Sequence, residues 1–187
     1  MNTSQTFAGT ALAAGAALLN SGAFTFYSGT MPASPETSLS GNTSLCAFTF
    51  SSTAFGTPSY SSGYMSAAAS FTESAETPSA GGTANFIRAT ESGGTAVADF
   101  TVQAPWAAST AVIVGQYVTN GGNSYVCTTA GTTASSGGPS GTGTGIDDGT
   151  AVWSYSAAGA DYTLGNAVLQ TGTPLTMTSF SLKLPAV

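Results

Sequence analysis

The chain has 187 residues, enough for one ordinary domain and a small second one. Only 5% of its residues are charged, against about 25% in a typical soluble domain, and eight acidic residues opposed by Arg88 and Lys183 give a net charge of −6. A nucleic-acid binder needs clustered Lys and Arg to displace counterions from phosphates, so this composition excludes that class. A polar but uncharged surface suits a protein held against a large assembly.

The first expected element is a helix near the N-terminus, because Thr3 or Ser4 can cap a segment whose apolar residues follow a period close to 3.6. These apolar residues are Phe7, Ala11, Leu12, Ala14, Leu18 and Leu19. Asn20-Ser21-Gly22 is expected to end the helix, with Gly22 in the left-handed C′ position. At about 13 residues the segment is too short to span a bilayer. No basic residue precedes it, so a signal peptide and a membrane role are not expected.

Short strands separated by turns rich in Gly and Pro are expected over the rest of the chain. The strands predicted outside the segment 104–157 are Ala23–Ser28, Ser44–Ser51, Tyr64–Phe71, Thr83–Ala89, Thr95–Val102, Asp161–Leu164 and Thr173–Leu184. Turns are expected at Gly29–Glu36 and at Ser92-Gly93-Gly94, and Pro185 is expected to end the last strand. The pattern predicts a mainly β protein with a β-sandwich or jelly-roll body and one N-terminal helix, in which Thr173–Leu184 pairs with strands from the first hundred residues.

The segment 104–157 differs from its surroundings, since it contains both tryptophans and a low-complexity loop at residues 131–145. Its expected strands are Val112–Val118, Ser124–Thr128 and Ala151–Tyr155, with turns at Asn120-Gly121-Gly122-Asn123 and Asp147-Asp148-Gly149. We therefore expect a small three-stranded β module, 104–157, inserted into a discontinuous body made of residues 1–103 and 158–187.

The sequence contains no recognisable catalytic or metal-binding motif. The chain has no histidine, and Cys46 and Cys127 lack metal-ligand spacing, so two buried thiols are expected and no zinc site. The close acid pair Glu73 and Glu76 is expected to be solvated in a loop, and the adjacent Asp147 and Asp148 are expected in a turn. We expect neither an enzyme nor a cofactor.

The segment 104–157 resembles the small chitin-binding-type carbohydrate-binding modules of chitinases, and more closely their relatives inserted into phage tail and virion proteins. The matching pieces are the entry residue Trp106, the GQYV motif with Gly115 and Tyr117, the N-G-G-x-x-Y hairpin ending at Tyr125 and Cys127, and the closing Trp153. The resemblance implies a binding-type module.

The aromatic residues of this segment have two interpretations. Flat aromatic faces bind sugar rings by apolar stacking, which makes Trp106, Tyr125 and Trp153 the candidate carbohydrate-binding residues. A module this small buries little surface, so these rings and their neighbours Tyr117 and Tyr155 can instead form its core. The sequence leaves both interpretations open.

The body resembles a family of small virion proteins of tailed bacteriophages. The resemblance rests on five segments: Ala17–Gly22 (ALLNSG), Phe26–Thr37 (FYSGTMPASPET), Ala54–Gly56 (AFG), Thr83–Thr90 (TANFIRAT) and Ser179–Pro185 (SFSLKLP). It implies a structural particle component. One interpretation is a capsid decoration (cement) protein on the outer capsid surface, whose partners are the major capsid protein and neighbouring copies of itself. The alternative is a tail, collar or fibre-associated protein whose module binds host-surface carbohydrate.

Overall fold

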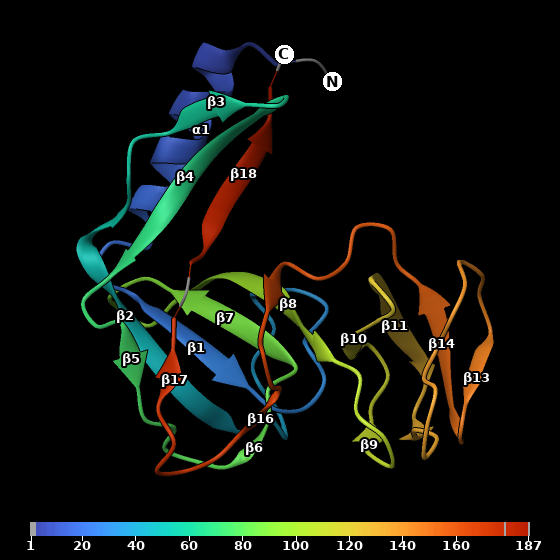
Figure 1. The fold of residues 1–187 in the computed structure, drawn as a ribbon. Coiled ribbons are helices and arrows are strands. Elements are labelled where there is room, and N and C mark those ends of the chain that lie inside the picture. The colour runs from blue at the N-terminus through green and yellow to red at the C-terminus, as the bar shows by residue number, and fades with distance from the viewer. Residues whose placement is uncertain (1–2, 178, 187) are drawn as a thin grey trace.

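The computed structural model describes residues 3–177 and 179–186 and shows a mainly β protein with one helix, α1 (Gln5–Ala17). The expected β-sandwich body with an N-terminal helix is confirmed, and a small group of strands lies beside it (Figure 1). The strands of the body are β1 (Ala23–Tyr27), β2 (Ser44–Phe55), β3 (Ser59–Ser61), β4 (Tyr64–Phe71), β5 (Ala75–Glu76), β6 (Gly82–Thr83), β7 (Phe86–Thr90), β8 (Ala96–Pro105), β15 (Tyr162–Thr163), β16 (Val168–Leu169), β17 (Leu175–Thr176) and β18 (Ser181–Pro185). The others are β9 (Ala111–Val112), β10 (Tyr117–Asn120), β11 (Asn123–Thr129), β12 (Gly131–Thr132), β13 (Ile146–Asp148) and β14 (Ala151–Tyr155).

Helix α1 begins as expected but buries a different face from the predicted one. The Ser4 side chain accepts a hydrogen bond from the Phe7 backbone N–H, as an N-cap does. The buried helical residues are Ala8, Leu12 and Ala16, and the helix packs against β4, β18 and β2. Of the predicted apolar face, Leu12 and Leu19 are buried, whereas Phe7, Ala11, Ala14 and Leu18 are exposed. The helix is rich in alanine and glycine on every side, so its pattern does not reveal which side is buried.

The end of the helix shows why the chain needs a glycine at position 22. The left-handed residue is Ser21, with φ of 55°, so the prediction that Gly22 adopts this conformation was wrong. At Gly22 a Cβ atom would lie 1.9 Å from the carbonyl oxygen of Thr90. The glycine is therefore required by the close approach of another strand end and not by its own dihedral angle.

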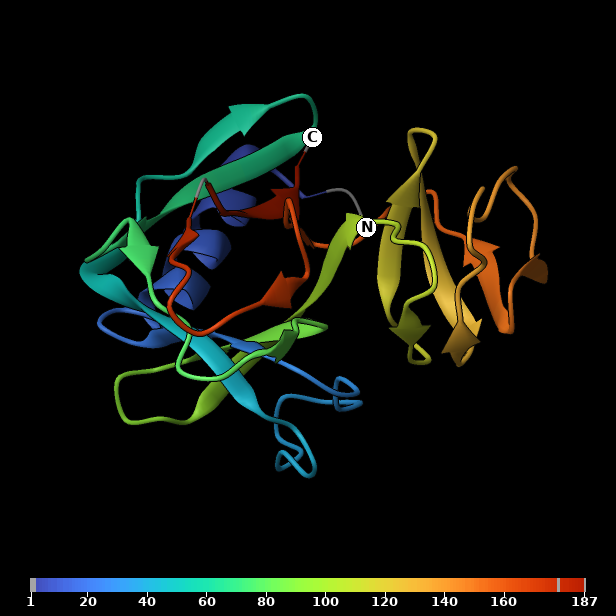
Figure 2. The ribbon, with the colours of Figure 1, turned by 60° about the horizontal axis from the view of Figure 1, so that its bottom comes forward.

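The core of the body is built around Phe24 of β1. Its ring lies within 4.8–6.2 Å, centroid to centroid, of the rings of Phe26, Phe50, Phe71, Phe100, Tyr162 and Phe180. Two of these rings come from the last part of the chain, which returns across the body and closes its core (Figure 2). The packing of these aromatic side chains therefore joins the beginning of the chain to its end.

The C-terminal segment pairs with early strands, as expected. Leu175 in β17 faces Glu76 in β5, and Leu182 in β18 faces Ala67 in β4. The predicted single strand Thr173–Leu184 is nevertheless two short strands, and Thr178 between them lies outside the described residues. Pro185 belongs to β18, where it pairs with Tyr64, so the strand extends one residue further than predicted.

A buried ion pair lies on the face of the body sheet opposite to that of Phe24. Arg88 of β7 and Asp99 of β8 are direct cross-strand neighbours, with side chains 7% and 5% exposed and two hydrogen bonds of 2.7 Å. The Arg88 guanidinium also donates to the carbonyl oxygen of Thr37 at 3.1 Å. The pair thus fixes the β7–β8 register and attaches the long connection 28–43 to the sheet.

Strand β8 continues beyond the body. Its first part pairs with β7, and its last three residues pair in parallel with Tyr117–Thr119 of β10. The strand predicted at Val112–Val118 was wrong, because Gly115 (φ +85°) turns the chain and separates β9 from β10. The expected turn at Asn120–Asn123 is confirmed, since Gly121 and Gly122 both have positive φ between β10 and β11.

Two substitutions of glycine by alanine test the close approach at the end of α1. In Gly22→Ala the new methyl group would collide with the Thr90 carbonyl, which should lower the free energy of unfolding by about 1–3 kcal/mol. Gly15→Ala is the matched control, because no atom lies within 4 Å of its Cβ position and alanine favours a helix by about 0.5–1 kcal/mol. Urea unfolding followed by circular dichroism should show opposite signs for the two variants. A neutral Gly22→Ala would contradict this packing.

Candidate functional site

The segment from Trp106 to Tyr155, which we call the small module, has its own cluster of buried residues, separate from that of the body. At its centre lies Asp148, which is 4% exposed. Its Oδ2 accepts hydrogen bonds from the indole N–H groups of Trp106 and Trp153, at 2.7 and 3.1 Å. Its Oδ1 accepts from the backbone N–H of Ala134 at 2.9 Å. One carboxylate therefore connects both tryptophans to the loop that follows β12.

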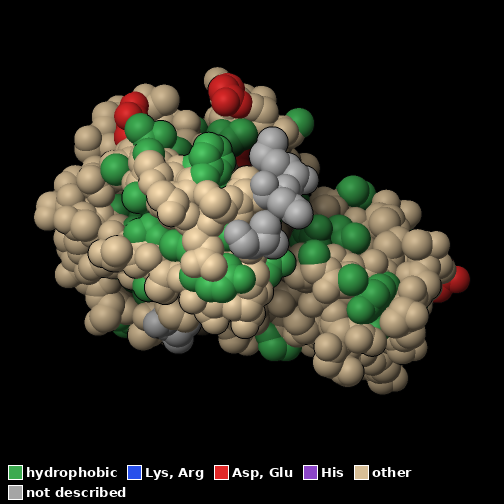
Figure 3. All heavy atoms as spheres, turned by 90° about the horizontal axis from the view of Figure 1, so that it is seen from above, with side chains coloured by type: hydrophobic (Ala, Val, Ile, Leu, Met, Phe, Trp, Pro, Cys, Tyr) green, Lys and Arg blue, Asp and Glu red, His purple; other side chains and the backbone are tan. Residues whose placement is uncertain are grey.

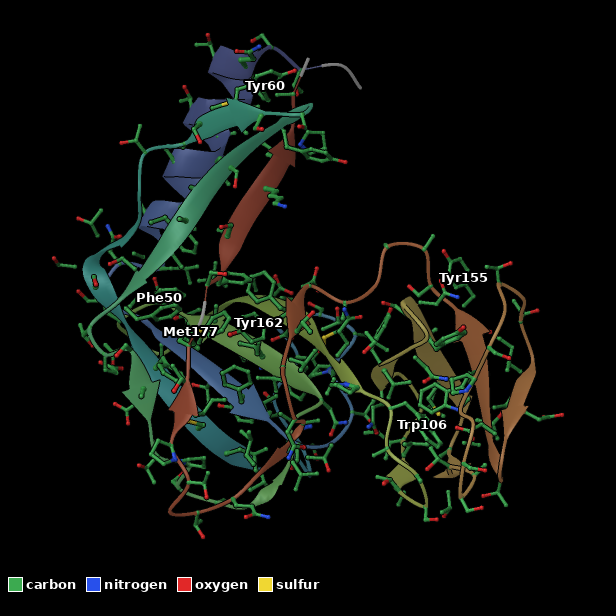
Figure 4. The ribbon with its side chains drawn as sticks, viewed as in Figure 1. Phe50, Tyr60, Trp106, Tyr155, Tyr162 and Met177 are labelled. Carbon is green, nitrogen blue, oxygen red and sulfur yellow. The ribbon has the colours of Figure 1, made fainter. Side chains whose placement is uncertain are left out.

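The structure brings Trp106 and Trp153 together but places two of the three predicted sugar-binding residues in the interior. Tyr125 and Trp153 are both 0% exposed, so neither offers a ring face to a sugar, and packing in the core accounts for both. Only Trp106 is partly exposed, and it lies within the module (Figure 4). Tyr125 and Trp153 therefore belong to the core of the module, which was the second interpretation of these rings.

The low-complexity loop is packed against Trp106. Gly138, with φ of +77°, approaches the indole so closely that a Cβ atom would lie 2.9 Å from its Cδ2. Asn120 Nδ2 donates to the carbonyl oxygens of Gly137 and Pro139, and Pro139 is fully buried. The glycines thus allow the loop to cover part of the tryptophan surface that the carbohydrate hypothesis requires.

Sequence reasoning missed the role of Asp148, which was expected in a turn and lies at the end of β13. The missed signal is strand alternation. In the β13–β14 hairpin Asp148 pairs with Ala151 and Ile146 pairs with Trp153, so all four side chains share one face. An acid on the same face as a tryptophan is a candidate acceptor for the indole N–H.

The other titratable side chains have structural surroundings. Glu73 was expected to be solvated, but it is half-buried, and its Oε1 accepts a hydrogen bond from the Thr49 backbone N–H at 2.6 Å. Glu76, also half-buried, lies in β5. Both cysteines are buried and unbridged, as expected, and burial raises the pKa of the Cys46 thiol to about 11. Over residues 3–177 and 179–186 there is no cluster of three or more His, Cys, Asp or Glu side chains suited to a metal ion.

The surface of α1 is the second candidate site. Phe7 of α1 is 60% exposed and Leu18, the C-cap residue, is 56% exposed, and the helix has no charged residue. The first charged side chain of the whole chain is Glu36. Tyr60 of β3, 44% exposed, adds an aromatic side chain at the same end of the body. Figure 3 shows several hydrophobic side chains on this end and, among the residues it describes, no Lys or Arg. Such a surface favours contact with another apolar surface.

Comparison of the chain with protein-family models, with curated proteins and with solved structures finds no match. Within the part of the chain that the structure describes, no helix has the length and apolar character needed to cross a membrane.

Asp148 and its neighbour Asp147 provide a matched test of the module core. Asp148→Ala would leave two largely buried indole N–H groups without an acceptor and should lower the free energy of unfolding of the module by about 3 kcal/mol. Asp147→Ala removes an exposed carboxylate and should change it by less than about 0.5 kcal/mol. Urea unfolding followed by tryptophan fluorescence reports on the module, because it contains both tryptophans. Similar effects of the two substitutions would contradict the central role of Asp148.

Proposed function

We propose that this protein is a non-enzymatic structural component of a tailed bacteriophage particle, a decoration or cement protein on the outer surface of the capsid. The observation that carries the proposal is the exposed surface of α1, which has no charged residue and presents the large apolar side chains of Phe7 and, at its C-cap, Leu18. The resemblance of the body to small phage virion proteins supplies the kind of particle. The partners in this proposal are the major capsid protein and neighbouring copies of the chain.

The energetics of this surface support a contact made many times on one particle. Burying a large apolar side chain contributes about 1.5–3 kcal/mol, so Phe7 and Leu18 together can supply a modest affinity per copy. α1 and the small module lie at different ends of the molecule (Figure 1), so the protein can contact a shell through α1 while the module remains accessible.

The alternative is a tail, collar or fibre-associated protein whose module contacts host-surface carbohydrate. The partial exposure of Trp106 favours it, because an accessible edge of an indole can still contact a sugar. A single such contact is weak, so many copies on one particle would be required for useful binding. Retention of the protein on chitin, lost in Trp106→Ala while the variant remains folded, would favour this alternative.

A surface double variant tests the capsid proposal. Phe7→Ser with Leu18→Ser should weaken binding to capsids that lack the protein by at least about tenfold, since 1.4 kcal/mol corresponds to a factor of ten. The melting temperature should hardly change, because both side chains are exposed. Capsids assembled with this variant should also lose tolerance to heat and to low ionic strength.

Val168→Ser is the matched control. Val168 is an apolar side chain, 44% exposed, on β16 at the other end of the body from α1 (Figure 1). This substitution should leave capsid binding and capsid tolerance unchanged. Equal capsid binding by the wild type and the α1 double variant would contradict the proposed contact.

A further inference from the structure

A polar cleft of about 610 Å³ opens on the body between Phe100 in the middle of β8, residues 161–163 around β15 and residues 179–183 at the start of β18. Its volume lies within the range of sites that hold small ligands. The side chains that matter for its chemistry are Phe100, Asp161, Ser179, Ser181 and Lys183. They come from three separate parts of the chain, and none of them was a candidate in the sequence.

The cleft contains a carboxylate and an ammonium group that do not pair with each other. In residues 3–177 and 179–186 the only ion pair is Arg88–Asp99, so Lys183 is the one cation outside it. Asp161 Oδ2 accepts hydrogen bonds from the backbone N–H and the hydroxyl of Thr101, at 2.8 and 2.7 Å. Within the described part of the chain, Asp161 Oδ1 and Lys183 Nζ make no protein hydrogen bond. Thr101 therefore holds the Asp161 carboxylate in place, and among the described residues Asp161 Oδ1 is left as an acceptor and Lys183 Nζ as a donor for a ligand.

An aromatic side chain of the cleft is held rigidly in place. The half-buried Phe100 ring packs against Phe180, with centroids 5.0 Å apart and an angle of 72° between the rings, and against Phe24. Its position is therefore set by the core of the body, so a ligand that contacts it need not order it. The hydroxyls of Ser179 and Ser181 line the same space and can both donate and accept hydrogen bonds.

We propose that this cleft binds a neutral saccharide. A sugar hydroxyl can donate to Asp161 Oδ1, a second can accept from Lys183 Nζ, and an apolar sugar face can contact Phe100. The charges of Lys183 and Asp161 cancel, so the cleft favours an uncharged ligand. An acidic ligand would in addition be repelled by the net charge of −6. The site is separate from the small module and does not depend on the contact made by α1.

Amide chemical shifts measured by NMR test the proposal directly on the full chain. The probes are cellotetraose and tetra-N-acetylchitotetraose, with tetragalacturonate as the acidic comparison, each at about 10 mM, well above a millimolar Kd. The amide of Thr101 reports on Asp161 because it donates to that carboxylate, and the amides of residues 179–183 report on the other wall. We expect at least one neutral probe to shift these amides in a saturable way and the acidic probe to shift them at least tenfold more weakly.

Two substitutions distinguish binding in the cleft from non-specific binding elsewhere on the protein. Lys183→Met removes the donor and keeps a long side chain, whereas Asp161→Asn keeps an oxygen for Thr101 and replaces the free acceptor with a donor. Each should weaken binding of the neutral probe at least tenfold, and Asp147→Asn, an exposed acid in the module, should not. The proposal is overturned if neither neutral probe shifts these amides, if the two cleft variants bind as the wild type does, or if the shifts are confined to residues around Trp106.

Discussion

The continuity of strand β8 is the constraint on which the rest of the structure depends. Its first part is fixed in the body by pairing with β7 and by the buried pair of Arg88 and Asp99, and its last part carries β10 of the small module. Because one strand belongs to both parts, the module is held in a fixed direction relative to the body. β15 also pairs with β8, at Val102 and Gln103, so the chain that leaves the module returns to the same strand.

Two polar centres hold together a chain that is nearly free of charge. Arg88 and Asp99 join a long connection to the body sheet, and Asp148 joins two tryptophans to a loop in the module. Each of these groups is buried, so each depends on its partners for the hydrogen bonds that water would otherwise make. Three of the charged side chains, those of Arg88, Asp99 and Asp148, are thus used in the interior, and α1 itself has none.

Much of the fold could be predicted from local patterns. The strands Tyr64–Phe71 and Ala151–Tyr155 match to the residue, because Gly63 and Gly149 mark the turns that precede them. The burial of Tyr125 and Trp153 could not be predicted, since an aromatic residue suits a core and a binding surface equally well. The requirement for glycine at Gly22 and the cleft near Lys183 both arise from segments distant in sequence, and no local pattern contains that information.

The proposed place of the protein on a particle is most directly tested by its stoichiometry. Purified phage particles would be separated into components, and the amount of this chain would be measured against the major capsid protein by quantitative mass spectrometry. A decoration protein that contacts the shell through α1 should be present in a fixed ratio to the major capsid protein, in copies comparable in number to the capsid subunits. A dozen or fewer copies per particle would contradict the capsid role and place the chain in the tail or collar, and absence from the particle would contradict a virion role altogether.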